Sequence, residues 1–364
     1  MGSTFHSQRL FWARVPPALV LVVWILLYLP NLRTSPGWYG DETIALTAAQ
    51  ELMRGVPAHR AFWNTFWHPY APYQPGYEYL IGLFAAPFGG DILGGRLLNV
   101  LLALAAATIM VTYGQRILGT VPALFSSLIF LTYPQTILHF RWIFTHNLIA
   151  LGLIITTLAL CRRPGRKHDL LAGCGLAMGA AALPLFSYGA VASGLWRIAS
   201  PRSWPWLVVP PTFVVVFSLA LGWILHLPNQ FLINDLVKTF HFYTQATSEN
   251  SGSLAGVASN IWIFITHDWF HFAGFLALLL CFKRKTAAIG FMGLVVAFFL
   301  LQNRRNLVVF YYQAILLTPL ISMAFGVVLS RLYRLLRTWG LRHNKSRLAV
   351  FAAFSIPAGQ CIAI

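Results

Sequence analysis

Long apolar runs alternate with short polar segments along most of the 364 residues. An α-helix needs about 20 apolar residues to cross the hydrocarbon core of a bilayer, and many of these runs approach that length. The pattern predicts an all-α polytopic membrane protein with about 10–11 transmembrane helices. The predicted spans are 13–30, 97–113, 118–138, 145–160, 169–185, 186–197, 205–226, 258–282, 286–302 and 307–330, with a possible further span at 348–363. The range 186–197 is short, and with 169–185 it could instead form a hairpin that does not fully cross.

One apolar stretch, Gly76–Gly89, decides the topology because every later loop changes sides if it spans. It is only about 14 residues long and contains Glu78 and Pro87, which favours a helix lying at the membrane interface. With that interpretation, eighteen of the 26 basic residues fall on one side of the membrane and eight on the other. The positive-inside rule assigns the side with more basic residues to the cytoplasm.

The resulting topology has a cytoplasmic amino terminus, because the first apolar run lacks a signal-peptide cleavage site and reads as a retained span. It predicts one domain over residues 1–347, with 348–364 as a last span or a tail. Two large loops, 31–95 and 227–257, lie on the extracytoplasmic side. The first is expected to carry two interfacial helices, at about 41–54 and 76–88.

The composition supports a membrane protein, with 58% apolar and 10% charged residues. The net charge of +17 does not indicate nucleic-acid binding, because the basic residues punctuate the apolar spans instead of clustering on a soluble module. The four cysteines show neither a disulfide framework nor a CxxC spacing. Only nine residues are acidic, and two of them, Asp41 and Glu42, are adjacent just beyond the first span. A carboxylate in that place is a candidate catalytic base.

Several motifs resemble the GT-C superfamily of polytopic glycosyltransferases, in particular the branch of protein O-mannosyltransferases and aminoarabinose transferases. Gly40-Asp41-Glu42 resembles the acidic motif in that branch's first extracytoplasmic loop. Gln74-Pro75 resembles its Pro-rich entry to a second helix, although the Lys that often precedes the prolines there is absent. The stretch 134–147 resembles the next charged motif, with His146-Asn147 where an acid is often found, and 304–326 resembles a late Arg-Tyr…Pro span. No large soluble carboxy-terminal domain is expected within these 364 residues.

The resemblance implies an inverting transferase that moves a sugar from a polyprenyl-phosphate donor to a glycan, lipid or protein acceptor. The reaction is expected on the extracytoplasmic face of a membrane, for which the compact loops favour a bacterial inner membrane. Membrane lipids are the other expected partners. No cofactor is predicted.

Such a reaction needs a base for the acceptor hydroxyl and cations for the phosphate leaving group. Asp41 is the candidate base and Glu42 its alternate or supporting partner, although both also suit the first turn of a helix. Glu78 is a candidate for orienting the acceptor or the donor sugar. Arginine forks suit phosphate, but each could equally be a headgroup anchor. The candidate binding residues are Glu78, Arg96, Arg141, His146, Lys238, His241, Arg304, Arg305, His59, Arg60 and His68.

Two other interpretations remain open. The pair His267 and His271 has the i, i+4 spacing of metal ligands, but no third ligand is evident, so no metal site is predicted; Asp268 is expected to pair with a neighbouring histidine or an arginine. A carrier or flippase for lipid-linked sugars would be expected to show an internal repeat, which is not found. A truncated, non-catalytic family member acting as an assembly partner is the third possibility.

Overall fold

The computed structural model describes residues 16–37, 40–54, 75–182, 186–224, 258, 262, 266, 268–283, 285–302 and 313–342. All regular secondary structure in these residues is helical, which agrees with the predicted class. A first helix covers Pro16–Tyr28. It is followed by α2 Gly40–Met53, α4 Pro75–Ala85, η1 Ala86–Phe88, α5 Ile92–Thr112, α6 Gln115–Leu118, α7 Thr120–Thr132, α8 Pro134–Arg141, α9 His146–Leu160, α10 Arg166–Ala180, α11 Phe186–Trp196, η2 Pro201–Ser203, α12 Trp204–Ile224, α15 Trp269–Leu279, α16 Ala287–Gln302, η3 Ala314–Leu316 and α18 Thr318–Arg342.

Two helical stretches in the described part of the chain, Ile92–Leu118 and Thr318–Leu336, are long and apolar enough to cross a membrane. The pair α7 and α8 passes the same test together but bends by 64° at Tyr133-Pro134. Tyr133 has an extended backbone there because the proline ring disfavours a helical conformation in the residue before it. The predicted span 118–138 is therefore a broken helix. The full number of spans stays a prediction.

Helix α9 forms the centre of the bundle and is buried along nearly its whole length. It packs against α5, α10, α11, α16 and α18. Its approach to α10 is close because two glycines face each other: a Cβ on Gly152 would lie 2.3 Å from the carbonyl oxygen of Gly175. Small residues at such contacts are the usual means by which membrane helices pack tightly.

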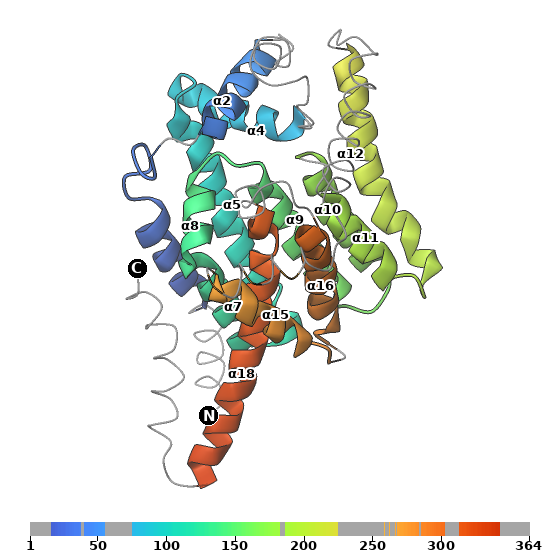
Figure 1. Ribbon diagram of the computed structural model, residues 1–364. Coiled ribbons are helices and arrows are strands. Elements are labelled where there is room, and N and C mark those ends of the chain that lie inside the picture. The colour runs from blue at the N-terminus through green and yellow to red at the C-terminus, as the bar shows by residue number, and fades with distance from the viewer. Residues whose placement is uncertain are drawn as a thin grey trace, which may run out of the picture.

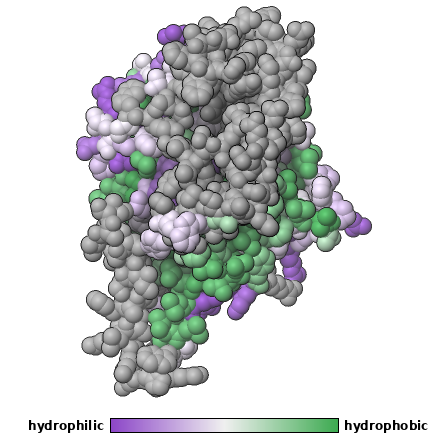
Figure 2. Space-filling view, viewed as in Figure 1, coloured by the Kyte–Doolittle hydropathy of each residue, from purple (hydrophilic) through white to green (hydrophobic). Residues whose placement is uncertain are grey.

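Helices α2 and α4 pack together at one end of the molecule, above the ends of α5 and α8 (Figure 1). They lie where the sequence predicts two helices in the first loop; their position at a membrane interface stays a prediction. Figure 2 shows polar side chains gathered at this end on the upper left, and apolar side chains over the lower and right flanks. The predicted loop 227–257 and the segment 348–364 lie outside the described residues.

Candidate functional site

The first turn of α2 is anchored by a fully buried ion pair between Glu42 and Arg96 of α5. Arg96 Nε donates to Glu42 Oε1 at 2.9 Å and Nη2 donates to Oε2 at 2.7 Å. The backbone N–H of Ile143, in the turn between α8 and α9, also donates to Oε1 at 3.0 Å. Both charged side chains are 0% exposed. Such a two-pronged pair fixes geometry as well as charge, so it holds α2 against α5 in one register.

Two arginines bind the segment that joins the first helix to α2. Arg96 Nη1 donates to the carbonyl oxygen of Leu32 at 3.1 Å, and Nη2 donates to that of Gly37 at 3.3 Å. Arg141 donates to the carbonyl oxygens of Leu27, Pro30 and Ser35. These contacts satisfy backbone acceptors that no helix or sheet satisfies. The path of the chain into the Asp41-Glu42 motif is therefore set by the two arginines.

A buried network of polar side chains lies below the ion pair. Tyr77 of α4 donates its hydroxyl to Asn99 Oδ1 at 2.8 Å, and Asn147 Nδ2 of α9 donates to the same oxygen at 2.7 Å. Asn147 Nδ2 also donates to the carbonyl oxygen of His139 at 2.8 Å. The network joins α4, α5, α8 and α9. Tyr77 and Asn99 were not predicted as site residues, although a lone Asn within an apolar span is a recognisable signal.

Glu78 of α4 is buried, and burial raises the pKa of its carboxyl group from 4.5 to about 8. Its Oε2 has no hydrogen-bond partner among the described residues. The carboxyl group is therefore protonated at neutral pH and able to donate a hydrogen bond. This state suits the predicted role of contacting a hydroxyl-rich ligand.

Glu78→Gln is expected to remove a loss of stability that the native protein shows as the pH rises. The folded state keeps the Glu78 proton up to a pH of about 8, whereas the unfolded state loses it near 4.5. The free energy of unfolding therefore falls as the pH rises between these two values. At pH 7 it is about 3 kcal/mol lower than below pH 4.5. Tm measured in one detergent at pH 5 and pH 8 should fall less in the variant.

Asp91→Asn is the matched control for that measurement. The N–H of Leu93, together with the nearby Arg33, lowers the pKa of Asp91, so this group is ionised in both states throughout the range from pH 5 to pH 8. Its replacement should change Tm by the same amount at both pH values. If Tm depended on pH equally in the native protein and in the Glu78→Gln variant, the assignment of a protonated Glu78 in the folded state would be wrong.

His146 opens α9, and its ring stacks on Phe144 with 4.4 Å between the centroids. Neither ring nitrogen has a hydrogen-bond partner among the described residues, although both are buried. His139 lies nearby on α8, where its Nδ1 is 2.7 Å from the carbonyl oxygen of Gln135. His146 is therefore the predicted binding residue whose buried polar atoms have the greatest unused hydrogen-bonding capacity in this region.

A second buried pair lies at the start of α15. His271 Nδ1 is 2.7 Å from Asp268 Oδ2, which confirms the expected pairing of Asp268 with a neighbouring histidine. The Tyr133 hydroxyl donates to the same carboxylate at 3.0 Å, a contact that the sequence did not indicate. His267 lies outside the described residues. Within the described part of the chain, no three His, Cys, Asp or Glu side chains lie close enough to hold a metal ion.

The structure brings Glu42, Glu78, Arg96, Arg141 and His146 to the end of the bundle where α2, α4, α5, α8 and α9 meet. Asp41 belongs to the first turn of α2, and its side chain is outside the description. The remaining predicted site residues lie outside the described residues: His59, Arg60, His68, Lys238, His241, Arg304 and Arg305.

No protein-family model and no curated protein matches the sequence. Solved structures do match the fold. ArnT from Cupriavidus metallidurans bound to undecaprenyl phosphate has a TM-score of 0.64 and 18% identity over 90% of this chain and 61% of its own. The oligosaccharyltransferase AglB from Archaeoglobus fulgidus, in complex with an inhibitory peptide and a dolichol-phosphate, has a TM-score of 0.56 and 11% identity over 96% of this chain and 54% of its own.

The two similar proteins are GT-C members, so the fold predicted from the sequence motifs is confirmed. At these identities the similarity concerns the fold. This chain spans 61% of the length of ArnT and 54% of the length of AglB.

Proposed function

We propose that this protein is an inverting glycosyltransferase that moves a sugar from a polyprenyl-phosphate donor to a hydroxyl acceptor on the extracytoplasmic face of a membrane. The observation that carries the proposal is the fully buried Glu42–Arg96 pair, which fixes the Asp41 backbone at the meeting point of α2, α5 and α8. Two of the nine acidic residues of the chain, Asp41 and Glu42, lie in the first turn of α2. The fold shared with ArnT, solved with undecaprenyl phosphate, supports the donor class.

In the proposed reaction the acceptor hydroxyl oxygen attacks C1 of the sugar and forms the new glycosidic bond. The bond between C1 and the phosphate oxygen breaks, and its electron pair leaves with the polyprenyl phosphate. Asp41 takes the hydroxyl proton, because a carboxylate placed beside the acceptor accelerates proton removal in the transition state. Glu42 is then a positioning residue: its oxygens already accept three hydrogen bonds, so it is poorly placed to accept the proton.

The leaving phosphate needs cationic partners. Arg96 is fully buried and occupied by Glu42, so we assign it to holding α2 and not to contacting phosphate. Arg141 is part-buried, and its Nε has no hydrogen-bond partner among the described residues. Arg141 therefore remains a candidate for binding the phosphate. The other candidates are Arg304, Arg305, Lys238 and the first-loop residues His59, Arg60 and His68. Protonated Glu78, together with His146 and His241, is proposed to contact sugar or acceptor hydroxyl groups.

The test is donor turnover by the full chain purified into nanodiscs. Polyprenyl-phosphate sugars of several kinds are supplied with candidate glycan, lipid and protein acceptors, and free polyprenyl phosphate and the glycosylated product are quantified by mass spectrometry. We expect stoichiometric release of both, with the anomeric configuration of the sugar inverted in the product.

A parallel measurement distinguishes the alternatives. In proteoliposomes, a lipid-linked sugar that moves between leaflets without cleavage would replace the transferase proposal with the carrier interpretation. An absence of both cleavage and movement across the whole panel would favour a non-catalytic assembly partner.

A further inference from the structure

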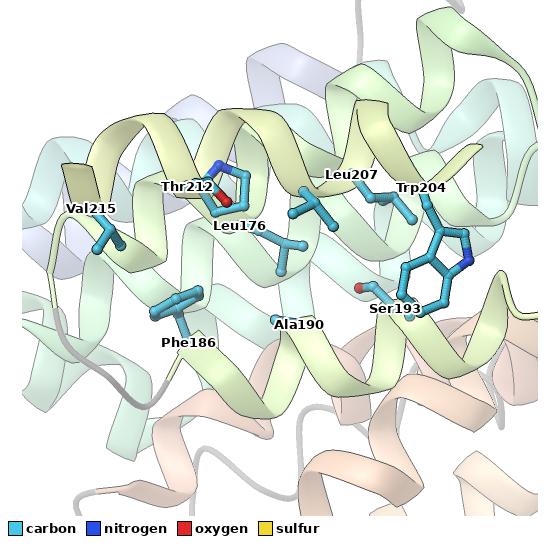
Figure 3. Close-up of a pocket in the computed structure, with 11 residues that line it drawn as sticks. Leu176, Phe186, Ala190, Ser193, Trp204, Leu207, Thr212 and Val215 are labelled. Carbon is cyan, nitrogen blue, oxygen red and sulfur yellow. The ribbon is translucent and has the colours of Figure 1, made fainter. Parts of the chain in front are cut away.

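An apolar groove runs between α10, α11 and α12 (Figure 3). The groove-facing helices α11 and α12 lie away from α2 and α5, which hold Glu42 and Arg96 (Figure 1). Its volume is about 310 Å³. In Figure 3, Phe186 and Val215 lie at one end of the groove, and Ser193 and Trp204 lie at the other. The side chains along it are almost all apolar, with Thr212 and Ser193 as exceptions. Ser193 is itself occupied, because its hydroxyl donates to the carbonyl oxygen of Gly189 at 2.6 Å. The groove thus suits a hydrocarbon chain.

The Trp204 end of the groove has a basic rim. Arg202 is exposed in η2, two residues before Trp204. The guanidinium of Arg166 lies 4.3 Å from the ring centroid of Trp206, which places the exposed start of α10, including Lys167, beside the start of α12. In Figure 2, polar side chains reappear at the right-hand tip of the view, where α12 begins in Figure 1. The rim therefore combines positive charge with an entrance to an apolar groove.

The rim keeps its charge because the carboxylate in the same segment of the chain already has partners of its own. Asp169 is the one acidic residue between positions 161 and 224. It is fully buried, where it accepts a hydrogen bond from Arg197 Nε at 2.9 Å and one from the N–H of Gly165 at 2.7 Å. The exposed cations Arg202, Arg166 and Lys167 therefore face no compensating acid within this segment.

We propose that the groove and its basic rim form a binding site for an anionic phospholipid, with an acyl chain in the groove and the headgroup phosphate at the rim. Between Trp204 and Val215, α12 rises by about 16 Å, which is about half of the 30 Å hydrocarbon core and matches one leaflet. The headgroup phosphate would lie at the basic rim near Trp204, and the acyl chain would extend along the groove toward Val215 and the middle of the bilayer. Basic pockets between membrane helices are suited to anionic headgroups. The site is separate from the proposed transfer reaction and does not depend on it.

The test is lipid retention by the purified full chain, measured by native mass spectrometry after equilibration with equal amounts of phosphatidylglycerol and phosphatidylcholine. We expect the native protein to retain phosphatidylglycerol preferentially. The double variant Lys167→Gln/Arg202→Gln should reduce that preference about thirtyfold, because each of the two basic residues contributes on the order of 1 kcal/mol to the binding of an anionic lipid. The control, Lys285→Gln/Arg334→Gln, removes the same charges from exposed residues elsewhere and should leave the preference unchanged.

A groove-filling variant tests the apolar half of the site. Gly194 lines the groove, and a Cβ placed there would have only Trp204 near it, at 3.7 Å, so Gly194→Leu can project into the open space. Retention of both lipids should fall while Tm stays within a few degrees. Equal lipid retention in all variants would overturn the proposal. So would displacement of the phospholipid by polyprenyl phosphate at equal concentration, which would assign the groove to the donor lipid.

Discussion

Asp41→Asn is expected to slow sugar transfer by about 10²–10⁴-fold while the protein keeps its fold and still binds the lipid donor. An asparagine has nearly the shape of aspartate, but it cannot accept the proton that the acceptor hydroxyl loses. The loss should therefore appear in kcat, with KM for the donor little changed. The measurement is the initial rate of polyprenyl phosphate release at saturating donor, together with Tm for both proteins.

Glu51→Gln is the control, because it neutralises another acid on the same helix, α2, near its other end. It should leave the rate close to that of the native protein. If Asp41→Asn turned over at the native rate, Asp41 would be excluded as the base. The search would then move to Glu42 and Glu78, the two other carboxylates of the site.

The fold class and the positions of α2 and α4 could be predicted from the sequence, because short amphipathic stretches and the charges between apolar runs are local features of the chain. The predicted span 97–113 left Arg96 just before its start, but α5 begins earlier, at Ile92, where the Asp91 side chain caps the helix by accepting from the N–H of Leu93. Arg96 therefore lies within a helix. That burial was not predicted, because it depends on Glu42, 54 positions earlier in the chain.

Contacts between residues far apart in the sequence also explain why other site residues were not predicted. Tyr77 and Asn99 form one hydrogen bond across two helices, and neither residue type signals that partner in its own segment. The contact of Tyr133 with Asp268 joins positions 135 residues apart. By contrast, the pairing of Asp268 with His271 was predictable because the i, i+3 spacing brings the two side chains together locally.

Arg96→Met is expected to lower the free energy of unfolding by about 3–5 kcal/mol, because it leaves Glu42 as a buried charge without its partner. It also removes the hydrogen bonds that Arg96 donates to the carbonyl oxygens of Leu32 and Gly37, on the path into α2. Tm and denaturant midpoints in a single detergent measure the effect. Transfer activity should fall with it, since the Asp41 backbone loses its anchor.

Two further variants separate the buried pair from a general effect of losing an arginine. Arg33→Met breaks the ion pair with Asp91, where the side chains are 70% and 26% exposed, and should cost about 1 kcal/mol or less. The double variant Arg96→Met/Glu42→Gln should be more stable than Arg96→Met alone, because no uncompensated charge remains buried. Stability losses that simply add in the double variant would show that the two side chains act independently. The Glu42–Arg96 pair would then no longer explain how the Asp41 motif is held in place.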